Sequence, residues 1–162
     1  AMARLLPKWI KRVHDIEKLP DDCVVFVDEA HRYVNARQSS SAGNQEIGLL
    51  SGLARQRNQL IIYATHISRK LDIIEISDAK RIVFKRPTGV QVMLDRAEIK
   101  PFNARAMKAF QEKGGNSKQW AYVADLENLT FGMVKVQQAS FWQEGMSTAM
   151  KTLGQEELEE VA

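Results

Sequence analysis

The sequence predicts an α/β fold with a mostly parallel sheet flanked by helices, and three stretches of the chain support this class. Residues 24–27 and 60–64 are short apolar runs of the kind that form strands buried on both faces. Residues 45–57, between them, carry apolar side chains at helical spacing. A strand, a helix and a second strand in this order form a parallel crossover unit, so both strands should end at one edge of the sheet.

Polar side chains stand at the ends of both predicted strands. Asp28 and Glu29 directly follow the first strand, and Thr65 and His66 follow the second. Ligands of open α/β sheets bind outside the carboxyl ends of the strands, where one carboxylate can hold Mg²⁺ and a second can orient or deprotonate a water. We therefore expect a functional site here. The alternative is that the two acids only favour the N-terminus of a following helix.

The remaining patterns predict short elements on both sides of this unit. Asn58 is expected to end its helix in the left-handed conformation. Residues 67–78 suggest an irregular segment or a turn of helix, and 90–94 alternate like an edge strand. The other expected elements are an amphipathic helix over 5–18, a strand over 81–85, a helix over 102–113 and a β-hairpin over 120–124 and 130–136.

Length and composition indicate one globular domain. The 162 residues can form a single core, which we place over 1–154, with its centre at 20–86, a helix and hairpin within 100–140 and an acidic tail at 155–162. The net charge of +3 permits a nucleic-acid partner without arguing for one. No apolar run approaches the ~18 residues of a membrane helix, and a single cysteine, Cys23, fits a reducing compartment, so we expect a cytoplasmic protein.

Several of these features together resemble a known class of enzymes. Residues 24–31, Val-Val-Phe-Val-Asp-Glu-Ala-His, resemble a Walker B motif with its catalytic glutamate. With Ala54-Arg55 at the end of the next helix, the polar pair after the second strand, and the 68–72 stretch before the strand at 81–85, the chain resembles the HerA/FtsK class of P-loop ATPases over residues 20–86. These are hexameric DNA-pumping motors, and the class includes conjugation and virus-packaging ATPases. The resemblance implies a RecA-like fold, ATP and Mg²⁺ as ligands, DNA as partner and a ring of like subunits.

The resemblance also implies roles for individual residues. Asp28 would bind the metal and Glu29 would act on the attacking water, while Thr65 and His66 occupy the place of a sensor that contacts the γ-phosphate. The sensor of this class usually ends in Gln, so His66 departs from the pattern.

Arg55 is the candidate arginine finger. Its helix leaves the ligand edge of the sheet, so its C-terminus lies at the opposite edge and Arg55 can reach only a neighbouring subunit's nucleotide. Arg57 is the alternative, although the helical wheel places it on the apolar side. The alternative is that Arg55 has no catalytic role and is simply a basic residue at a helix C-terminus, where the helix dipole favours positive charge.

Basic residues follow both strands on the ligand side. In a ring, such loops could line a pore and contact phosphates without sequence preference. These candidate nucleic-acid contacts are Arg32, Arg37, Arg69 and Lys70.

The phosphate-binding loop of such an ATPase is absent from the sequence, which contains no G-x-x-x-x-G-K-[ST]. We therefore expect this chain alone to bind nucleotide poorly and to be inactive. One explanation is that it is the C-terminal portion of a longer ATPase, incomplete at the N-terminal side. The other is a natural relative without the loop.

Two other functions remain open. In a fragment of a superfamily 2 helicase of the Asp-Glu-Ala-His type, Ala64-Thr65-His66 would take the Ser-Ala-Thr role, but too few residues remain for the second RecA-like domain of that class. A non-catalytic, Zot-like or phage-assembly module with a degenerate nucleotide site is the third possibility.

Overall fold

The computed structural model describes residues 6–13, 18–30, 52–71 and 73–141, which belong to two units. One unit comprises residues 16–136, and the other comprises 1–15 with 137–162. His31, Arg32, Arg37, most of the helix expected over 45–57 and the tail at 155–162 lie outside the described residues. None of the helices in the described ranges is long and apolar enough to cross a bilayer.

The smaller unit corrects the prediction of an N-terminal helix over 5–18 for residues 6–13, while residues 5 and 14–17 lie outside the described ranges. Residues 6–13 contain no helix; a turn begins at Pro7, whose carbonyl oxygen accepts the Ile10 N–H at 2.9 Å. The Trp9 ring instead meets Phe141 edge-on, with 5.6 Å between ring centroids. Short helices are marginal in water without packing along their apolar side, so helical spacing alone did not decide the structure here.

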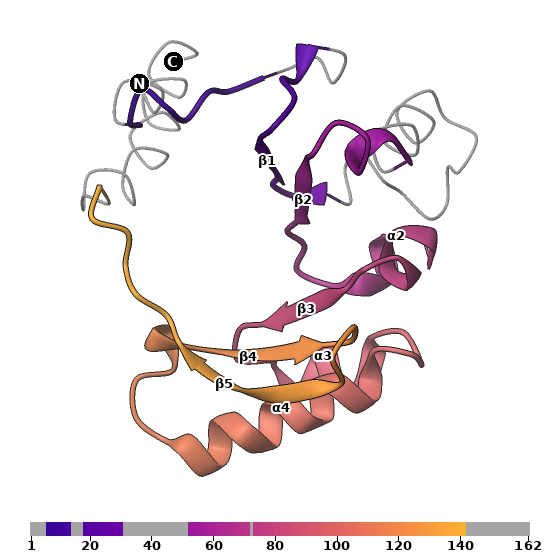
Figure 1. Cartoon of the computed structure of the whole chain (residues 1–162). Helices are drawn as coiled ribbons and strands as arrows, with labels where there is room; N and C mark the ends of the chain where they lie inside the picture. Colours follow the sequence, from indigo (N-terminus) through magenta and orange to yellow (C-terminus); the bar gives the residue numbers. More distant parts are fainter. Residues whose placement is uncertain (1–5, 14–17, 31–51, 72, 142–162) are drawn as a thin grey trace, which may run out of the picture. The chain divides into compact units, whose positions relative to one another are not determined.

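The larger unit begins with the predicted parallel strand pair. Strand β1 (Val24–Val27) pairs in parallel with β2 (Leu60–Tyr63), with Val24 opposite Leu60 and Val27 opposite Tyr63 (Figure 1). Residues 52–54 are helical, and Asn58 has a φ of 51°, which confirms the predicted left-handed residue after the helix. The predicted strand–helix–strand order therefore places both strand ends at one edge.

One face of this sheet is more exposed than predicted. Val25 is buried, whereas Phe26 and Leu60 expose 62% and 60% of their surface. In the described part of the chain, the parallel sheet contains only β1 and β2. A continuous apolar run thus indicates a strand that can be buried on both faces. In the described part of the chain, one face of β1 and β2 stays largely exposed.

Three further strands form a separate antiparallel sheet. Strand β3 (Arg81–Phe84) pairs with β4 (Trp120–Asp125), which pairs with β5 (Thr130–Lys135). The predicted hairpin is confirmed, but the described strands are not mostly parallel, because β3 joins the hairpin rather than β1 and β2. The 67–78 segment contains the short helices η4 (Ser68–Lys70) and α2 (Ile73–Ser77), and η5 (Ser117–Gln119) precedes β4.

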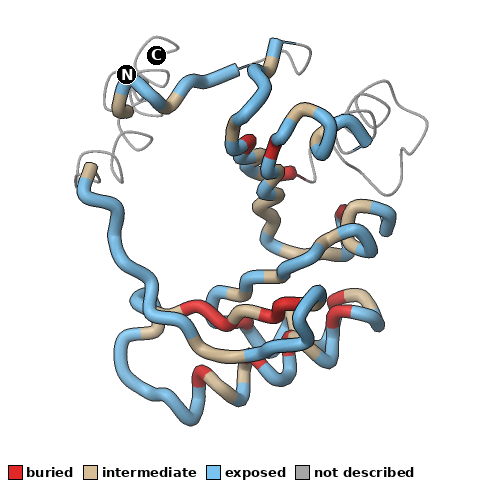
Figure 2. The backbone as a smooth tube through the Cα atoms, viewed as in Figure 1, coloured by how far each residue is buried: buried red, intermediate tan, exposed pale blue. Residues whose placement is uncertain are grey.

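Helix α4 (Lys100–Lys113) packs along one face of the antiparallel sheet (Figure 1). It extends the predicted helix by two residues at its start. Buried residues gather on α4 and on β4 (Figure 2). The core they form contains Ala106, Phe110, Tyr122 and Ala124.

Helix α3 (Gly89–Leu94) replaces the predicted edge strand. Thr88 caps it: its hydroxyl accepts the Gln91 N–H at 3.2 Å, and the Gln91 side-chain oxygen accepts the Thr88 N–H at 2.8 Å. This reciprocal pair is a capping box, whose Thr-x-x-Gln pattern precedes an apolar run. The alternation of Val90, Val92 and Leu94 was therefore the weaker of two competing patterns.

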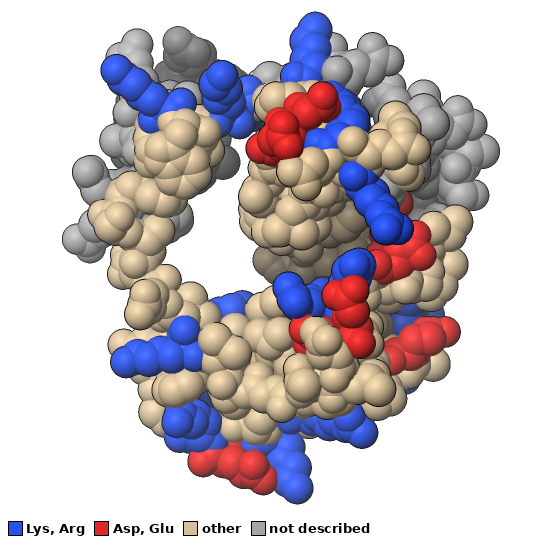
Figure 3. Space-filling model, viewed as in Figure 1, with Lys and Arg blue, Asp and Glu red and all other residues tan. Residues whose placement is uncertain are grey.

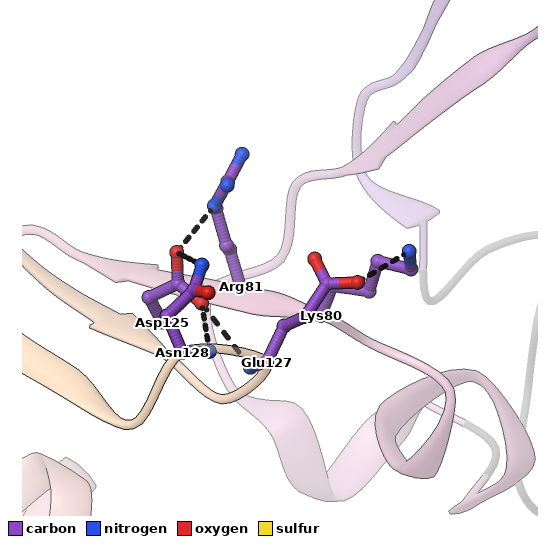
Figure 4. A network of polar contacts seen from close by, with 5 residues as sticks. All are labelled: Lys80, Arg81, Asp125, Glu127 and Asn128. Atoms are coloured by element: carbon purple, nitrogen blue, oxygen red, sulfur yellow. Dashed lines mark hydrogen bonds and ion pairs between the residues drawn. The ribbon is translucent and has the colours of Figure 1, made fainter.

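The turn between β4 and β5 is organised by one carboxylate (Figure 4). Asp125 Oδ1 accepts the backbone N–H groups of Glu127 and Asn128, and Asp125 Oδ2 accepts the Arg81 Nε–H at 2.9 Å. The Arg81 bond, followed by the Asn128 bonds, lowers the pKa of Asp125 from 3.8 to about 2. Because Arg81 stands opposite Asp125 in the ladder, this carboxylate joins the turn to β3.

We expect Asp125→Asn to change the acid stability of the protein. The carboxylate has a lowered pKa in the folded state, so its stabilisation is present above about pH 4 and is lost as the pH falls towards 2. Urea unfolding should therefore show a steeper loss of stability between pH 4 and pH 2 in the wild type than in the variant. Glu127→Gln, which removes an exposed pair with Lys80, is the control and should leave the steep loss in place. Parallel profiles for Asp125→Asn and wild type would contradict this assignment.

Candidate functional site

The chain turns sharply at the end of β1. Glu29 has a φ of 50°, in the left-handed region that non-glycine residues rarely adopt, and its N–H donates to Asp28 Oδ1 at 3.0 Å. Ala30 then becomes fully buried beside Leu71, and its N–H donates to the Ala64 carbonyl oxygen at 2.8 Å. The buried alanine anchors the turn, so the two acids are presented at the strand end.

The predicted site residues meet at this edge. Asp28, Glu29, Thr65 and His66 line a cleft of about 110 Å³ together with Ala64. His66 Nε2 lies 3.0 Å from Glu29 Oε1, which joins the two strand ends directly. The cleft is small beside typical small-molecule pockets of roughly 300 Å³ or more, so it could hold only part of a nucleotide. We call Asp28, Glu29, Thr65 and His66 the acidic site.

The two arginines after the second helix have different environments. Arg57 is half-buried: its Nε donates to Asp21 Oδ1 at 2.7 Å, and its guanidinium also donates to the Leu19 carbonyl oxygen. Arg55 is exposed. The Arg57 carbonyl oxygen accepts the Asp22 N–H just before β1, so this turn lies at the end of the sheet opposite the acidic site. Arg55 therefore lies at the end of the sheet that was predicted for it, and its role towards a neighbouring subunit stays a prediction.

Residues of α3 and of the α3–α4 connection hold the loop that follows β2. Gln91 Nε2 donates to the His66 carbonyl oxygen at 2.7 Å, and Arg96 donates to the carbonyl oxygens of Ser68 and Leu71. The buried Asp95 accepts bonds from Ser68 and from Asn103 of α4. These contacts fix the backbone that carries His66.

Three residues that hold this loop were not predicted from the sequence: Gln91, Asp95 and Arg96. The Thr88-x-x-Gln91 capping box was visible in the sequence and would have predicted α3. The tertiary partners of Asp95 and Arg96 were not visible, because they depend on how the loop after β2 meets α3.

We expect Gln91→Glu to change the environment of His66 without uncapping α3. A glutamate can still accept the Thr88 N–H, but it lacks the donor that holds the His66 carbonyl oxygen. The His66 ring signal in a ¹H–¹³C spectrum should therefore move, with a loss of stability of about 1 kcal/mol.

Thr88→Ala is the matched control for this change. It breaks the cap, at a similar cost of about 1 kcal/mol, and keeps the Gln91 bond to His66. The chain has only three histidines, so His66→Asn assigns the signal. An equal shift of the His66 signal in both variants would show that the signal responds to loss of the α3 cap and not to loss of the bond from Gln91.

The basic residues predicted to contact nucleic acid are only partly described. Arg69 and Lys70 lie on η4 and are exposed, and Arg69 donates to the Leu94 carbonyl oxygen at 3.4 Å. On the face drawn in Figure 3, Lys and Arg side chains are interspersed with Asp and Glu side chains rather than forming one continuous band. The positive charges of Arg69 and Lys70 are therefore not enough by themselves to define a nucleic-acid surface.

Comparison with known proteins finds a likeness in fold. No protein-family model and no curated protein matches the chain. The chain is similar to the genome packaging NTPase B204 from Sulfolobus turreted icosahedral virus 2 in its complex with AMP, with a TM-score of 0.51 and 18% identity, over 73% of this chain and 55% of that one. The complex of B204 with ATP-gammaS gives a TM-score of 0.49 and 17% identity, over 71% and 52% of the two chains.

The likeness to the AMP complex establishes a mixed α/β fold that matches part of a packaging NTPase. The prediction of a resemblance to virus-packaging ATPases is confirmed at this level of fold. The chain spans about half the length of the B204 structures it matches.

Proposed function

We propose that this chain is part of an ATP-hydrolysing motor that translocates or packages DNA. One observation carries the proposal: β1 and β2 end side by side and bring the Glu29 carboxylate within 3.0 Å of the His66 imidazole. The partial likeness in fold to a genome packaging NTPase supports it.

Asp28 is the residue that would hold Mg²⁺. Its carboxylate is exposed, and hard oxygen ligands of this kind suit Mg²⁺, which usually keeps several waters and takes its other ligands from phosphates. Within the described ranges, no group of three or more His, Cys, Asp and Glu residues forms a metal site, so one carboxylate with water and phosphate is the arrangement that fits. When bound, the ion would neutralise charge on the phosphates.

Glu29 would orient the attacking water and accept its proton, while Thr65 and His66 would contact the γ-phosphate or that water. The positions of the side chains support these roles. His66 extends from the loop held by Gln91 and lines the same cleft as Glu29. The Thr65 hydroxyl donates to the Ile67 carbonyl oxygen at 3.2 Å, so it would have to turn from that oxygen to donate to a phosphate. A neutral imidazole can donate or accept a hydrogen bond at the γ-phosphate.

The other parts of the motor would come from outside this site. The phosphate-binding loop would be supplied by residues outside this chain, and Arg55 would act on the nucleotide of the next subunit in a ring. Arg69 and Lys70, with Arg32 and Arg37, would contact the DNA backbone. The protein would act in the cytoplasm, consistent with the free Cys23, whose thiol donates to the Pro20 carbonyl oxygen.

The test compares this chain with the product of the complete reading frame that encodes it. We expect the complete protein to bind ATP with Mg²⁺ and to hydrolyse it faster when duplex DNA is added. The chain alone should bind nucleotide weakly and show no turnover. If calorimetry detects no ATP binding by the complete protein, the proposal fails and a non-catalytic assembly module becomes the better explanation.

A further inference from the structure

Four lysines are neighbours of Trp120, the first residue of β4, either in the fold or, for Lys118, in the sequence. The Lys85 ammonium donates to the carbonyl oxygens of Trp120 and Lys118, at 2.8 and 3.0 Å. Lys113 Nζ, at the end of α4, lies 4.1 Å from the centroid of the Trp120 ring, a cation–π contact. Lys135, at the end of β5, stands opposite Trp120 in the ladder. We call Lys85, Lys113, Lys118 and Lys135 the lysine cluster.

The charges of this cluster are not compensated. All four lysines are exposed, and in the described part of the chain none of them forms an ion pair with a carboxylate. Other basic residues near the same sheet do have acidic partners: Lys80 pairs with Glu127 at 2.8 Å, Arg81 with Asp125 at 2.9 Å and Lys108 with Glu112 at 3.8 Å. Like charges on neighbouring lysines repel one another unless an anion lies among them.

The wider region is basic as well. Residues 81–136 contain ten Lys and Arg against five Asp and Glu, although the whole chain has a net charge of only +3. Residues 81–136 therefore carry a net charge of +5, which suits an anionic partner.

We infer that the lysine cluster is a contact surface for the phosphate backbone of nucleic acid. Lysine ammonium groups bind phosphates as point charges without reading base sequence, and an adjacent aromatic ring adds a surface on which a base or sugar can pack. The choice of DNA as the polymer rests on the proposed function. The surface is distinct from Arg69 and Lys70, which follow β2.

Binding to DNA can be measured on this chain without nucleotide, so the test stands apart from ATP hydrolysis. The probe is a labelled 30-base-pair duplex of arbitrary sequence, and fluorescence anisotropy is recorded at several salt concentrations between 50 and 200 mM. The test variant combines Lys113→Gln, Lys118→Gln and Lys135→Gln. It leaves Lys85 in place because that side chain joins β3 to the start of β4.

The cluster variant should bind the duplex at least about tenfold more weakly at 100 mM salt, and the slope of log K against log salt should fall by about two to three. A control with the same loss of charge combines Lys80→Gln, Lys100→Gln and Lys108→Gln and should change affinity less than about threefold. Changing the three cluster lysines to Arg should preserve binding, which separates loss of charge from loss of structure.

Three results would overturn the inference. The first is equal weakening by the cluster variant and its control, which would indicate only a general effect of net charge. The second is unchanged affinity and slope in the cluster variant. The third is wild-type binding to vesicles of phosphatidylserine and phosphatidylcholine without binding to the duplex, which would assign the lysines to a membrane surface. The proposed function fails separately if the complete protein does not hydrolyse ATP. If the lysine cluster still binds DNA in that case, the inference about the cluster is supported.

Discussion

Replacing Glu29 by Gln is expected to lower the turnover number for ATP hydrolysis by roughly 10²–10⁴-fold in a form of the protein that has a phosphate-binding loop. The amide keeps the size of the side chain and can still contact His66, which lies 3.0 Å from the carboxylate. It cannot accept a proton from the attacking water. Phosphate release at saturating ATP and Mg²⁺ measures the effect.

The affinity for ATP provides the internal control for this experiment. It should change little, because the substitution acts on the water rather than on the phosphates. Glu127→Gln makes the same chemical change in the turn between β4 and β5 and should leave turnover unaffected. A Glu29→Gln protein within threefold of wild-type turnover would exclude Glu29 as the catalytic base.

Arg55→Ala is expected to lower turnover by about a thousandfold while changing stability by less than about 0.5 kcal/mol. Arg55 is exposed, so the folded subunit loses little when it is truncated. Arg57→Ala should show the reverse, a loss of about 1–2 kcal/mol of stability with little direct effect on turnover, because Arg57 holds Asp21 and the Leu19 carbonyl oxygen. Urea unfolding and turnover measured on both variants distinguish the two arginines.

Mixing two inactive proteins tests whether Arg55 acts across subunits. In a mixed ring, an Arg55→Ala subunit retains Glu29, and a neighbouring Glu29→Gln subunit can supply Arg55. Such an interface is complete, so mixing should restore measurable hydrolysis. If Arg55 served its own subunit's site, no mixture of the two variants would recover activity.

Local patterns predicted the part of the fold that holds the acidic site. The apolar runs ending at Val27 and Tyr63 and the helix between them were enough to predict a parallel pair, and that pairing brings Glu29 to His66. The hairpin of β4 and β5 was also predictable, because its strands are neighbours in sequence and a polar turn separates them. Whether these residues act in catalysis remains a prediction.

Pairing and packing between distant segments could not be predicted. The apolar run at β3 fits either sheet, and only its ladder with β4 decides that it joins the antiparallel one. Val90 and Val92 alternate as in a strand, yet the Thr88 cap directs that segment into a helix. The bond from Gln91 to the His66 carbonyl oxygen joins two elements whose contact no local pattern shows.

The left-handed backbone of Glu29 has an evolutionary consequence. A glutamate at a φ of 50° carries a conformational penalty of about 1–2 kcal/mol that glycine would avoid. Selection for thermal stability alone would therefore favour glycine at position 29, together with loss of the carboxylate. Homologues that retain an acid at position 29 do so despite this penalty, which indicates that they need the carboxylate. Homologues with glycine at this position would have retained the fold without the carboxylate's chemistry.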